Sequence, residues 1–393
     1  MYIRGDGVDG TAEIGYIVWV IFEQRCSMKE IKTFSLAFTY VGCFLGAGFI
    51  SGQELWQFFG AFGNWGYLGF FVSAVLFMLI GVMFVRLTQM TKCADMGKLL
   101  VPWDIKWLRT ATGVIGAAFL FFVVVSMSAG VGAMLQQLFG VPQWLGSAVF
   151  MLAVFLIALL GVSGMINAFS AMIPVLVLAT LGFAVAAWCT FGTEGILQLR
   201  NTNTNPLMPN WCIATLTFVA YNILGGIGIM APVGQYVPEK KHVYGGITLA
   251  GLMLLVVAGS ILTSLGCYPE AVAAELPMVA LASRLNGTLG AVYGIMLLVA
   301  MFCNALASLV GLISYLEQKA RFVREKKKML LAGLCLLAWA GSLLGFAELV
   351  VLNFLGSLVG IGIGINLVNA LVVAVLGIPG VFLLFLVKWL FGG

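Results

Sequence analysis

The sequence predicts an all-α polytopic membrane protein, and three observations carry this prediction. First, 62% of the 393 residues are hydrophobic and only 9% are charged, whereas about a quarter of a soluble domain is charged. Second, many apolar stretches reach the roughly 20 residues that a helix needs to cross about 30 Å of hydrocarbon. Third, these stretches are continuously apolar instead of alternating with polar residues, which excludes a transmembrane β-barrel.

Nine membrane spans are expected between residues 34 and 346, where apolar runs are separated by charged or turn-forming segments. The expected spans are Phe34–Phe59, Trp65–Val85, Thr110–Leu138, Trp144–Val162, Ala168–Cys189, Cys212–Val237, Val243–Leu265, Thr288–Tyr315 and Met329–Phe346. The tail Leu349–Phe391 is apolar apart from Gly377–Gly380. It has room for two spans, or for one span and a re-entrant segment, so about 10 or 11 spans are expected in all.

Lysine and arginine are distributed unevenly between the two sides of these spans. If the first span starts in the cytoplasm, the outer loops hold only Arg200 and Arg284, and nearly all other basic residues lie in inner segments. This bias predicts a plasma-membrane protein with a cytoplasmic N-terminus. Residues 1–27 do not fit the pattern, and we interpret them as a non-native or disordered extension ahead of a natural start at Met28. The alternative is a mobile cytoplasmic extension.

Composition also excludes several classes of function. The eight cysteines are scattered, no C-x-x-C pair is present, and His242 is the only histidine. A metal site or a Ser-His or Cys-His catalytic pair is therefore not expected. H-E-x-x-H, G-x-S-x-G and P-loop motifs are also absent from the sequence. Because the basic residues lie in short loops and form no single patch, no nucleic-acid partner is expected. The predicted protein is not an enzyme, needs no cofactor and has the lipid bilayer as its main partner.

Glycine interrupts two of the spans near their middles. The first span contains Gly46, Gly48 and Gly52, and the sixth contains Gly225, Gly226 and Gly228. Each glycine costs a helix interior about 1 kcal/mol relative to alanine. Unpaired backbone at membrane depth is tolerated where it lines a cavity within the protein, and it offers N–H groups to a carboxylate and carbonyl groups to a cation. The first and sixth spans each open a five-helix half, which favours the site of an inverted-repeat transporter. The alternative is that these glycines only permit close helix packing.

Glu54 is the only acidic residue well inside a predicted span. An ionisable group at membrane depth indicates a functional site, and this one could hold a coupling cation, carry a proton or bind a substrate ammonium. The alternative is a structural carboxylate that is hydrogen-bonded to Gln53 or to a neighbouring helix. Further polar side chains are expected to line the site: Tyr221 and Asn222 on the sixth span, and Asn304 and Ser308 on the eighth, the latter two near a coupling ion.

The run Gly46-Ala-Gly-Phe-Ile-Ser-Gly-Gln-Glu-Leu-Trp-Gln-Phe-Phe59 resembles the signature of the YkvI-type membrane proteins, a group of amino acid permeases in the amino acid–polyamine–organocation superfamily. The resemblance covers about Met28 to Val350 and includes the pair Tyr221-Asn222. It implies a LeuT-like five-plus-five inverted repeat with discontinuous first and sixth helices, an amino-acid-like substrate, and sodium or a proton as coupling ion. The site residues that it implies are Gly46, Ala47, Gly48, Ser51, Gly52, Gln53 and Glu54 on the first helix, and Gly225, Gly226 and Gly228 on the sixth.

The tail resembles a different family. The segment with Asn366, Asn369 and Leu376-Gly-Ile-Pro-Gly-Val381 is similar to BofA, a family of small membrane inhibitors of pro-sigma-K processing. This resemblance implies that Asn366 and Asn369 contact an intramembrane protease. The alternative is a divergent tenth helix with a re-entrant end.

Together these patterns predict three parts of the chain: the extension 1–27, a transporter-like domain 28–350 and an apolar tail 351–393. The expected function is secondary transport of an amino acid or a similar zwitterion by alternating access around a site at the membrane midplane. The alternative function is a non-transporting regulator of sporulation-type intramembrane proteolysis, acting through the tail.

Overall fold

The computed structural model describes residues 31–91, 95–101, 103–205 and 208–358, although the side chains of residues 321 and 344–358 are not described. Within these ranges the regular structure is helical, and the one β-pairing is an isolated bridge between Phe62 and Asn201. The predicted all-α class is therefore confirmed. The extension 1–27 and the tail residues Asn366 and Asn369 lie outside the described residues.

Each of the nine predicted spans overlaps a helical element. The first span is divided into α2 (Thr33–Phe44), α3 (Ala47–Ile50), α4 (Gln53–Leu55) and the π-helical turn η1 (Trp56–Gly60). The others are α5 (Asn64–Thr91), α7 (Lys106–Phe139), α8 (Gln143–Ala158), α9 (Gly161–Phe191), α10 (Trp211–Gly234), α11 (Lys240–Cys267), α13 (Gly287–Lys319) and α15 (Lys327–Leu358). Six helices of the described chain are long and apolar enough to cross a membrane, namely α5, α7, α9, α10, α11 and α13. These helices make the chain a multi-pass membrane protein.

Four short elements between the spans were not anticipated from the sequence. They are α6 (Met96–Leu100), the 3₁₀ turn η2 (Pro269–Ala273), α12 (Pro277–Leu285) and α14 (Arg321–Glu325). Their apolar runs are too short to stand out against membrane spans. Helix α15 continues to Leu358, beyond the predicted end of the ninth span at Phe346. Near Phe346 the sequence has no proline and no run of charged residues that would end α15.

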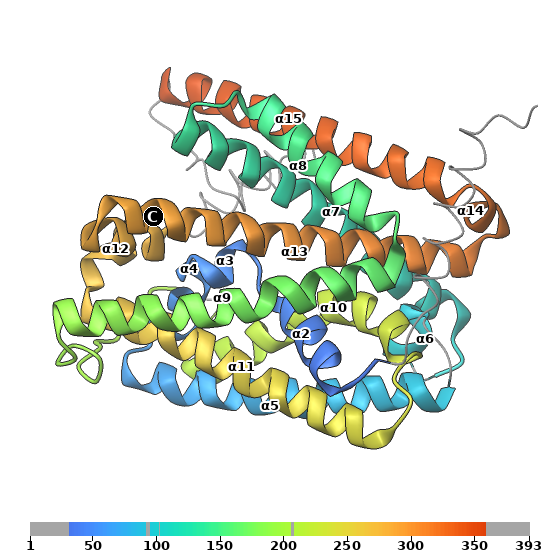
Figure 1. Ribbon diagram of the computed structural model, residues 1–393, viewed down its shortest axis with the longest axis horizontal. Coiled ribbons are helices and arrows are strands. Elements are labelled where there is room, and N and C mark those ends of the chain that lie inside the picture. Colours follow the sequence, from blue (N-terminus) through green and yellow to red (C-terminus); the bar gives the residue numbers. More distant parts are fainter. Residues whose placement is uncertain (1–30, 92–94, 102, 206–207, 359–393) are drawn as a thin grey trace, which may run out of the picture.

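The two halves of the chain repeat one pattern of helix lengths. The second helices of the halves, α5 and α11, each have 28 residues, and the third helices, α7 and α13, have 34 and 33. A short helix precedes each third helix: α6 precedes α7, and α12 precedes α13. Figure 1 shows α12 at one end of the bundle and α6 at the other. Equivalent elements at opposite ends are what an inverted repeat requires.

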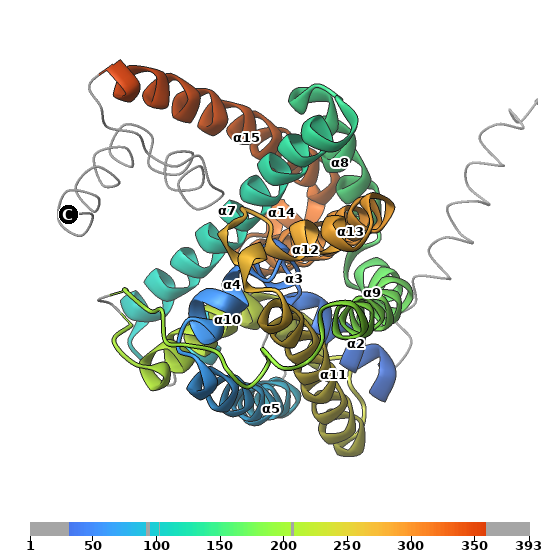
Figure 2. The same cartoon turned by 90° about the vertical axis from the view of Figure 1, so that its left-hand side faces the viewer.

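The helices of the two halves pack against one another around the divided first span. Helix α13 runs along α7, α11 packs on α5 and α2, and α10 packs on α5. Figure 2, viewed along the bundle, shows α3 and α4 inside this ring of longer helices. The first span is therefore the central element of the fold, and its backbone can only be reached between its neighbours.

Hydrogen bonds hold both ends of the first span to neighbouring segments. At the start, Thr33 Oγ1 lies 2.9 Å from His242 Nδ1, and the Ile31 N–H donates to the Tyr236 carbonyl at 3.1 Å. Beyond the last turn, the Thr202 N–H donates to the Ala61 carbonyl at 2.8 Å. The connection between α9 and α10 is thereby pinned to the end of the first span.

Side-chain caps fix where two of the long helices begin. The Asn210 side chain accepts a hydrogen bond from the Ile213 N–H at 3.0 Å at the start of α10, and Asn286 accepts one from Thr288 at 2.9 Å at the start of α13. Such caps satisfy backbone donors that have no partner within the helix.

Candidate functional site

The first span is broken twice, and the second break has a glycine in a conformation that other residues disfavour. Helix α2 ends at Phe44, Gly46 is extended (φ −89°, ψ −179°), and α3 begins at Ala47. The second break is at Gly52, whose φ of +80° lies in the left-handed region that side chains disfavour. A Cβ atom at Gly52 would also lie 2.8 Å from Leu265 Cδ1. The predicted discontinuity of the first helix is confirmed by this backbone.

Neighbouring elements satisfy the carbonyl groups that the breaks release. The Tyr293 hydroxyl on α13 donates to the Ile50 carbonyl at 2.8 Å, and the Met278 N–H on α12 donates to the Ser51 carbonyl at 2.9 Å. The Ser51 hydroxyl donates to the Gly48 carbonyl at 3.2 Å. Buried backbone groups without partners are costly in hydrocarbon, so these donors stabilise the broken conformation. Tyr293 and Met278 carry no signal in the sequence, because their partners depend on packing.

Three backbone N–H groups remain unpaired just after the first break. The N–H groups of Ala47, Gly48 and Phe49 make no backbone hydrogen bond in the described part of the chain. The first paired donors after the break are the N–H groups of Ile50 and Ser51, which donate to the carbonyls of Gly46 and Ala47. Free N–H groups at this point can bind an anionic group.

Glu54 folds back onto this segment. Its carboxylate lies against Gly48: a Cβ atom added there would be 3.1 Å from Cδ and 3.3 Å from each carboxylate oxygen. The Tyr221 hydroxyl on α10 donates a hydrogen bond to Glu54 Oε1. The partner is therefore on the sixth span, a neighbouring helix as the structural alternative allowed, and it is not Gln53. Glu54 is only partly buried.

Glu54 has no cationic partner among the described residues, where no lysine, arginine or histidine forms an ion pair with it. A carboxylate at membrane depth with only a neutral hydroxyl beside it favours a proton, a metal cation or a substrate ammonium. The Tyr221 ring stacks on Phe58, with ring centroids 5.8 Å apart, which fixes the hydroxyl beside the carboxylate.

The other predicted polar residues divide into two groups. Asn304 lies at the first break, because a Cβ atom added to Gly46 would be 2.7 Å from its Nδ2. Ser308 is buried one helical turn further along α13. Asn222 donates to the Phe218 carbonyl of its own helix at 2.9 Å, and the Gln53 N–H lies 3.4 Å from Ser51 Oγ. The structure thus places Asn304 beside Gly46 at the first break.

The predicted break in the sixth span is not present in this structure, since α10 is continuous from Trp211 to Gly234. Its glycines instead allow close packing. A Cβ atom at Gly226 would lie 2.9 Å from Phe44 Cζ, one at Gly228 would lie 2.6 Å from Leu120 Cδ1, and one at Gly311 would lie 3.0 Å from the Gly228 carbonyl oxygen. Helix α10 keeps its backbone hydrogen bonds through Gly225. The low helix propensity of the glycines is offset by close interhelical contacts that larger residues would prevent.

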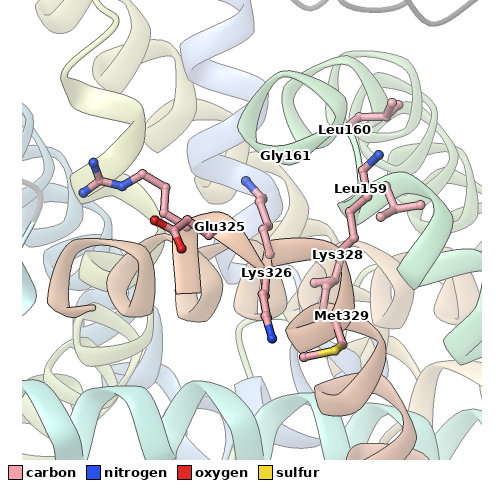
Figure 3. Close-up of a pocket in the computed structure, with 10 residues that line it drawn as sticks. Leu159, Leu160, Gly161, Glu325, Lys326, Lys328 and Met329 are labelled. Atoms are coloured by element: carbon pink, nitrogen blue, oxygen red, sulfur yellow. The ribbon is translucent and has the colours of Figure 1, made fainter. Parts of the chain in front are cut away.

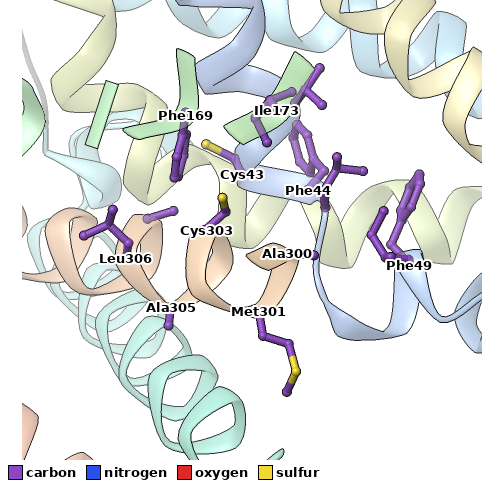
Figure 4. Close-up of a cluster of buried hydrophobic side chains, with 14 of the residues drawn as sticks. Cys43, Phe44, Phe49, Phe169, Ile173, Ala300, Met301, Cys303, Ala305 and Leu306 are labelled. Carbon is purple, nitrogen blue, oxygen red and sulfur yellow. The ribbon is translucent and has the colours of Figure 1, made fainter. Parts of the chain in front are cut away.

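Aromatic and thiol side chains form the apolar surroundings of the break. Figure 4 shows Phe44 and Phe49 on either side of it, with Cys43 and Cys303 close by. Phe44 packs on Phe77, with ring centroids 4.9 Å apart. The break is therefore surrounded by a carboxylate, free N–H groups and apolar side chains.

The amino-acid sequence is similar to that of a Bacillus subtilis membrane protein. The chain is 22% identical to YkvI of B. subtilis (strain 168) over 319 residues, which cover 80% of this chain and 89% of YkvI. This finding confirms the predicted resemblance to the YkvI-type membrane proteins, which implied the site residues.

Solved structures of transporters share the arrangement of helices. MhsT, solved in complex with L-phenylalanine, superposes with a TM-score of 0.57 at 17% identity and covers 78% of each chain. A Na⁺-coupled sialic acid symporter superposes with a TM-score of 0.63 at 11% identity, over 88% of this chain and 76% of that one. The chain has a LeuT-like fold. At these identities the likeness extends to the fold alone.

The C-terminal part matches the family model described as SigmaK-factor processing regulatory protein BofA, over residues 330–390. The predicted resemblance of the tail is thus confirmed. The match begins within α15, N-terminal to the predicted boundary at residue 351, and continues beyond the described residues.

Proposed function

We propose that this protein is a secondary transporter of an amino acid or a similar small zwitterion, driven by a sodium or proton gradient. The observation that carries the proposal is the pair formed by Glu54, beyond the break in the first helix, and Tyr221 on the sixth. The pair joins the first helices of the two halves at the only broken span of the described chain. Relative movement of these halves in alternating access would change its geometry.

Both charges of a zwitterion have a counterpart at the break. The unpaired N–H groups of Ala47, Gly48 and Phe49 suit a carboxylate. The Glu54 carboxylate suits an ammonium group or the coupling cation, and the Asn304 amide lies beside Gly46 to add a polar contact. Transport needs no chemical step, so no catalytic residue or resident cofactor is required. The plasma membrane and a cytoplasmic N-terminus are the proposed setting.

The test is uptake of a labelled amino acid mixture into proteoliposomes that contain the full chain. Three conditions are compared: a sodium gradient, a proton gradient and no gradient. Accumulation is expected with one gradient only, and that gradient identifies the coupling ion. A folded protein that accumulates nothing under any condition contradicts the proposal.

Glu54→Gln is expected to reduce uptake at least about tenfold, because a charge-assisted contact worth about 1.5–3 kcal/mol is removed. Glu194→Gln is the matched control, since this glutamate lies in the exposed connection after α9. Uptake by Glu54→Gln at the level of the control would exclude Glu54 from the site.

A second function is favoured by the family match over residues 330–390. In that case the chain regulates a membrane protease and transports nothing. Co-purification with such a protease that is lost in Asn366→Ala and Asn369→Ala, together with absent uptake, would support it. Uptake that is unchanged by these two substitutions would favour the transporter.

A further inference from the structure

A pocket of about 750 Å³ lies at the corner where α8 turns into α9 and α14 turns into α15. One wall is Leu159–Gly161, and the other is the segment from Arg324 to Leu331 (Figure 3). Gly161 has a φ of +64°, which allows the two-residue turn between α8 and α9. The pocket is at the same end of the bundle as α6 and is far in sequence from the broken first span (Figure 1).

The pocket carries an excess of positive charge. Arg324, Lys326, Lys327 and Lys328 line it, with Glu325 as its one acidic side chain. The Lys327 ammonium is paired with Glu317 at 2.8 Å. Lys326 and Lys328 form no ion pair in the described part of the chain, although Lys326 lies 4.9 Å from the centroid of the Phe322 ring. Two ammonium groups are therefore available to an anion.

Apolar side chains form the rest of the lining. Leu159, Leu160 and Leu331 lie on the two walls beside the basic residues. An exposed apolar surface continues along α15, where Leu336 and Leu337 are 62% and 63% exposed. On a membrane-spanning helix such a surface faces lipid chains. A ligand that fits the whole site has an anionic head and apolar chains, and a free phosphate would use only the charged part.

The distribution of lysine and arginine places this end of the bundle at the cytoplasmic surface of the membrane. We propose that the pocket binds the headgroup of an anionic phospholipid of the inner leaflet, with its acyl chains along α15. Lys326 and Lys328 bind the phosphate, and Leu159 and Leu160 contact the glycerol and the first methylene groups. Basic pockets between membrane helices on this side are suited to such headgroups.

The test is native mass spectrometry of the full chain in detergent, titrated with phosphatidylglycerol or phosphatidylcholine. The double variant Lys326→Gln/Lys328→Gln removes the unpaired charges. The matched control is Lys240→Gln/Lys241→Gln, which removes the same charge from exposed positions at the same end of the bundle. The wild type and the control are expected to bind phosphatidylglycerol at least about fivefold more tightly than phosphatidylcholine, and the pocket variant is expected to lose this preference.

Two results would overturn the proposal. Equal loss of preference in both double variants would mean that only the net surface charge attracts the lipid. Displacement of bound phosphatidylglycerol by an equal concentration of soluble glycerol phosphate would mean that the site binds a free phosphate ester and does not use the acyl chains. Because the readout is lipid binding, the result is independent of uptake activity.

Discussion

The first and sixth spans have similar glycine content but different backbones. The segment Gly46–Gly52 is broken twice, whereas α10 runs without interruption through Gly225–Gly228. The first span has donors from other helices at its released carbonyls, namely the Tyr293 hydroxyl and the Met278 N–H. In α10, Phe44 and other apolar groups pack closely against the glycines. Glycine permits a break in a membrane helix, but hydrogen-bond donors on other elements stabilise the broken conformation.

The largest effect is expected where the broken segment meets Glu54. Gly48→Leu places a side chain where a Cβ atom alone would lie 3.1 Å from the Glu54 carboxyl carbon. Uptake is expected to fall below detection in the proteoliposome assay, while size-exclusion chromatography shows a folded protein. Gly182→Leu is the control, since a Cβ atom there meets nothing within 4 Å. Similar uptake by both variants would show that the space between Gly48 and Glu54 is not used.

A moderate effect is expected from removing a donor to the break. Tyr293→Phe leaves the Ile50 carbonyl without its hydroxyl partner, and an unsatisfied buried acceptor costs about 1–3 kcal/mol. Tyr40→Phe is the comparison, because the Tyr40 hydroxyl donates at 2.6 Å to the Phe77 carbonyl within the unbroken α5. Thermal unfolding midpoints are expected to drop more for Tyr293→Phe. The reverse order would mean that the break does not depend on outside donors.

The smallest effect tests the continuous sixth span. Gly225→Ala is expected to stabilise α10 by up to about 1 kcal/mol, as alanine is the better helix former. The Cβ atom would lie 3.1 Å from the end of the Phe119 ring, which can move. We expect a higher unfolding midpoint and uptake within about threefold of wild type. A tenfold loss of uptake with a raised midpoint would instead reveal that α10 unwinds here during transport.

The fold was largely predictable because apolar length and the positions of charged residues directly reflect the membrane. The nine spans up to Phe346 and the break in the first helix follow from these features. The short helices α6 and α12 could not be found in this way, since nine or fewer residues cannot span a bilayer and their role is to pack against other helices.

Prediction of the site was less complete because side-chain partners depend on three-dimensional packing. Glu54 was predicted from its depth and from the family resemblance, and Tyr221 was predicted only as a polar side chain that lines the site. The hydrogen bond between them depends on how α10 packs beside the broken segment. Tyr293 gave no signal in sequence, because a tyrosine in an apolar helix has many possible acceptors. The break predicted from the glycines of α10 is absent, since glycine serves equally in breaks and in close packing.

The break in the first span also has a mechanical consequence. The α2 segment is fastened at one end of the bundle through Thr33 and His242, while the segment from Ala47 to Gly60 is fastened towards the other end through Ser51 and Met278. Only Leu45 and Gly46 connect α2 to this later segment, which is itself broken at Gly52. Such a two-residue joint can bend through its backbone dihedrals without breaking either set of fastenings. In the proposed transporter, this joint would let one end of the protein open while the hydrogen bonds at the other end stay in place.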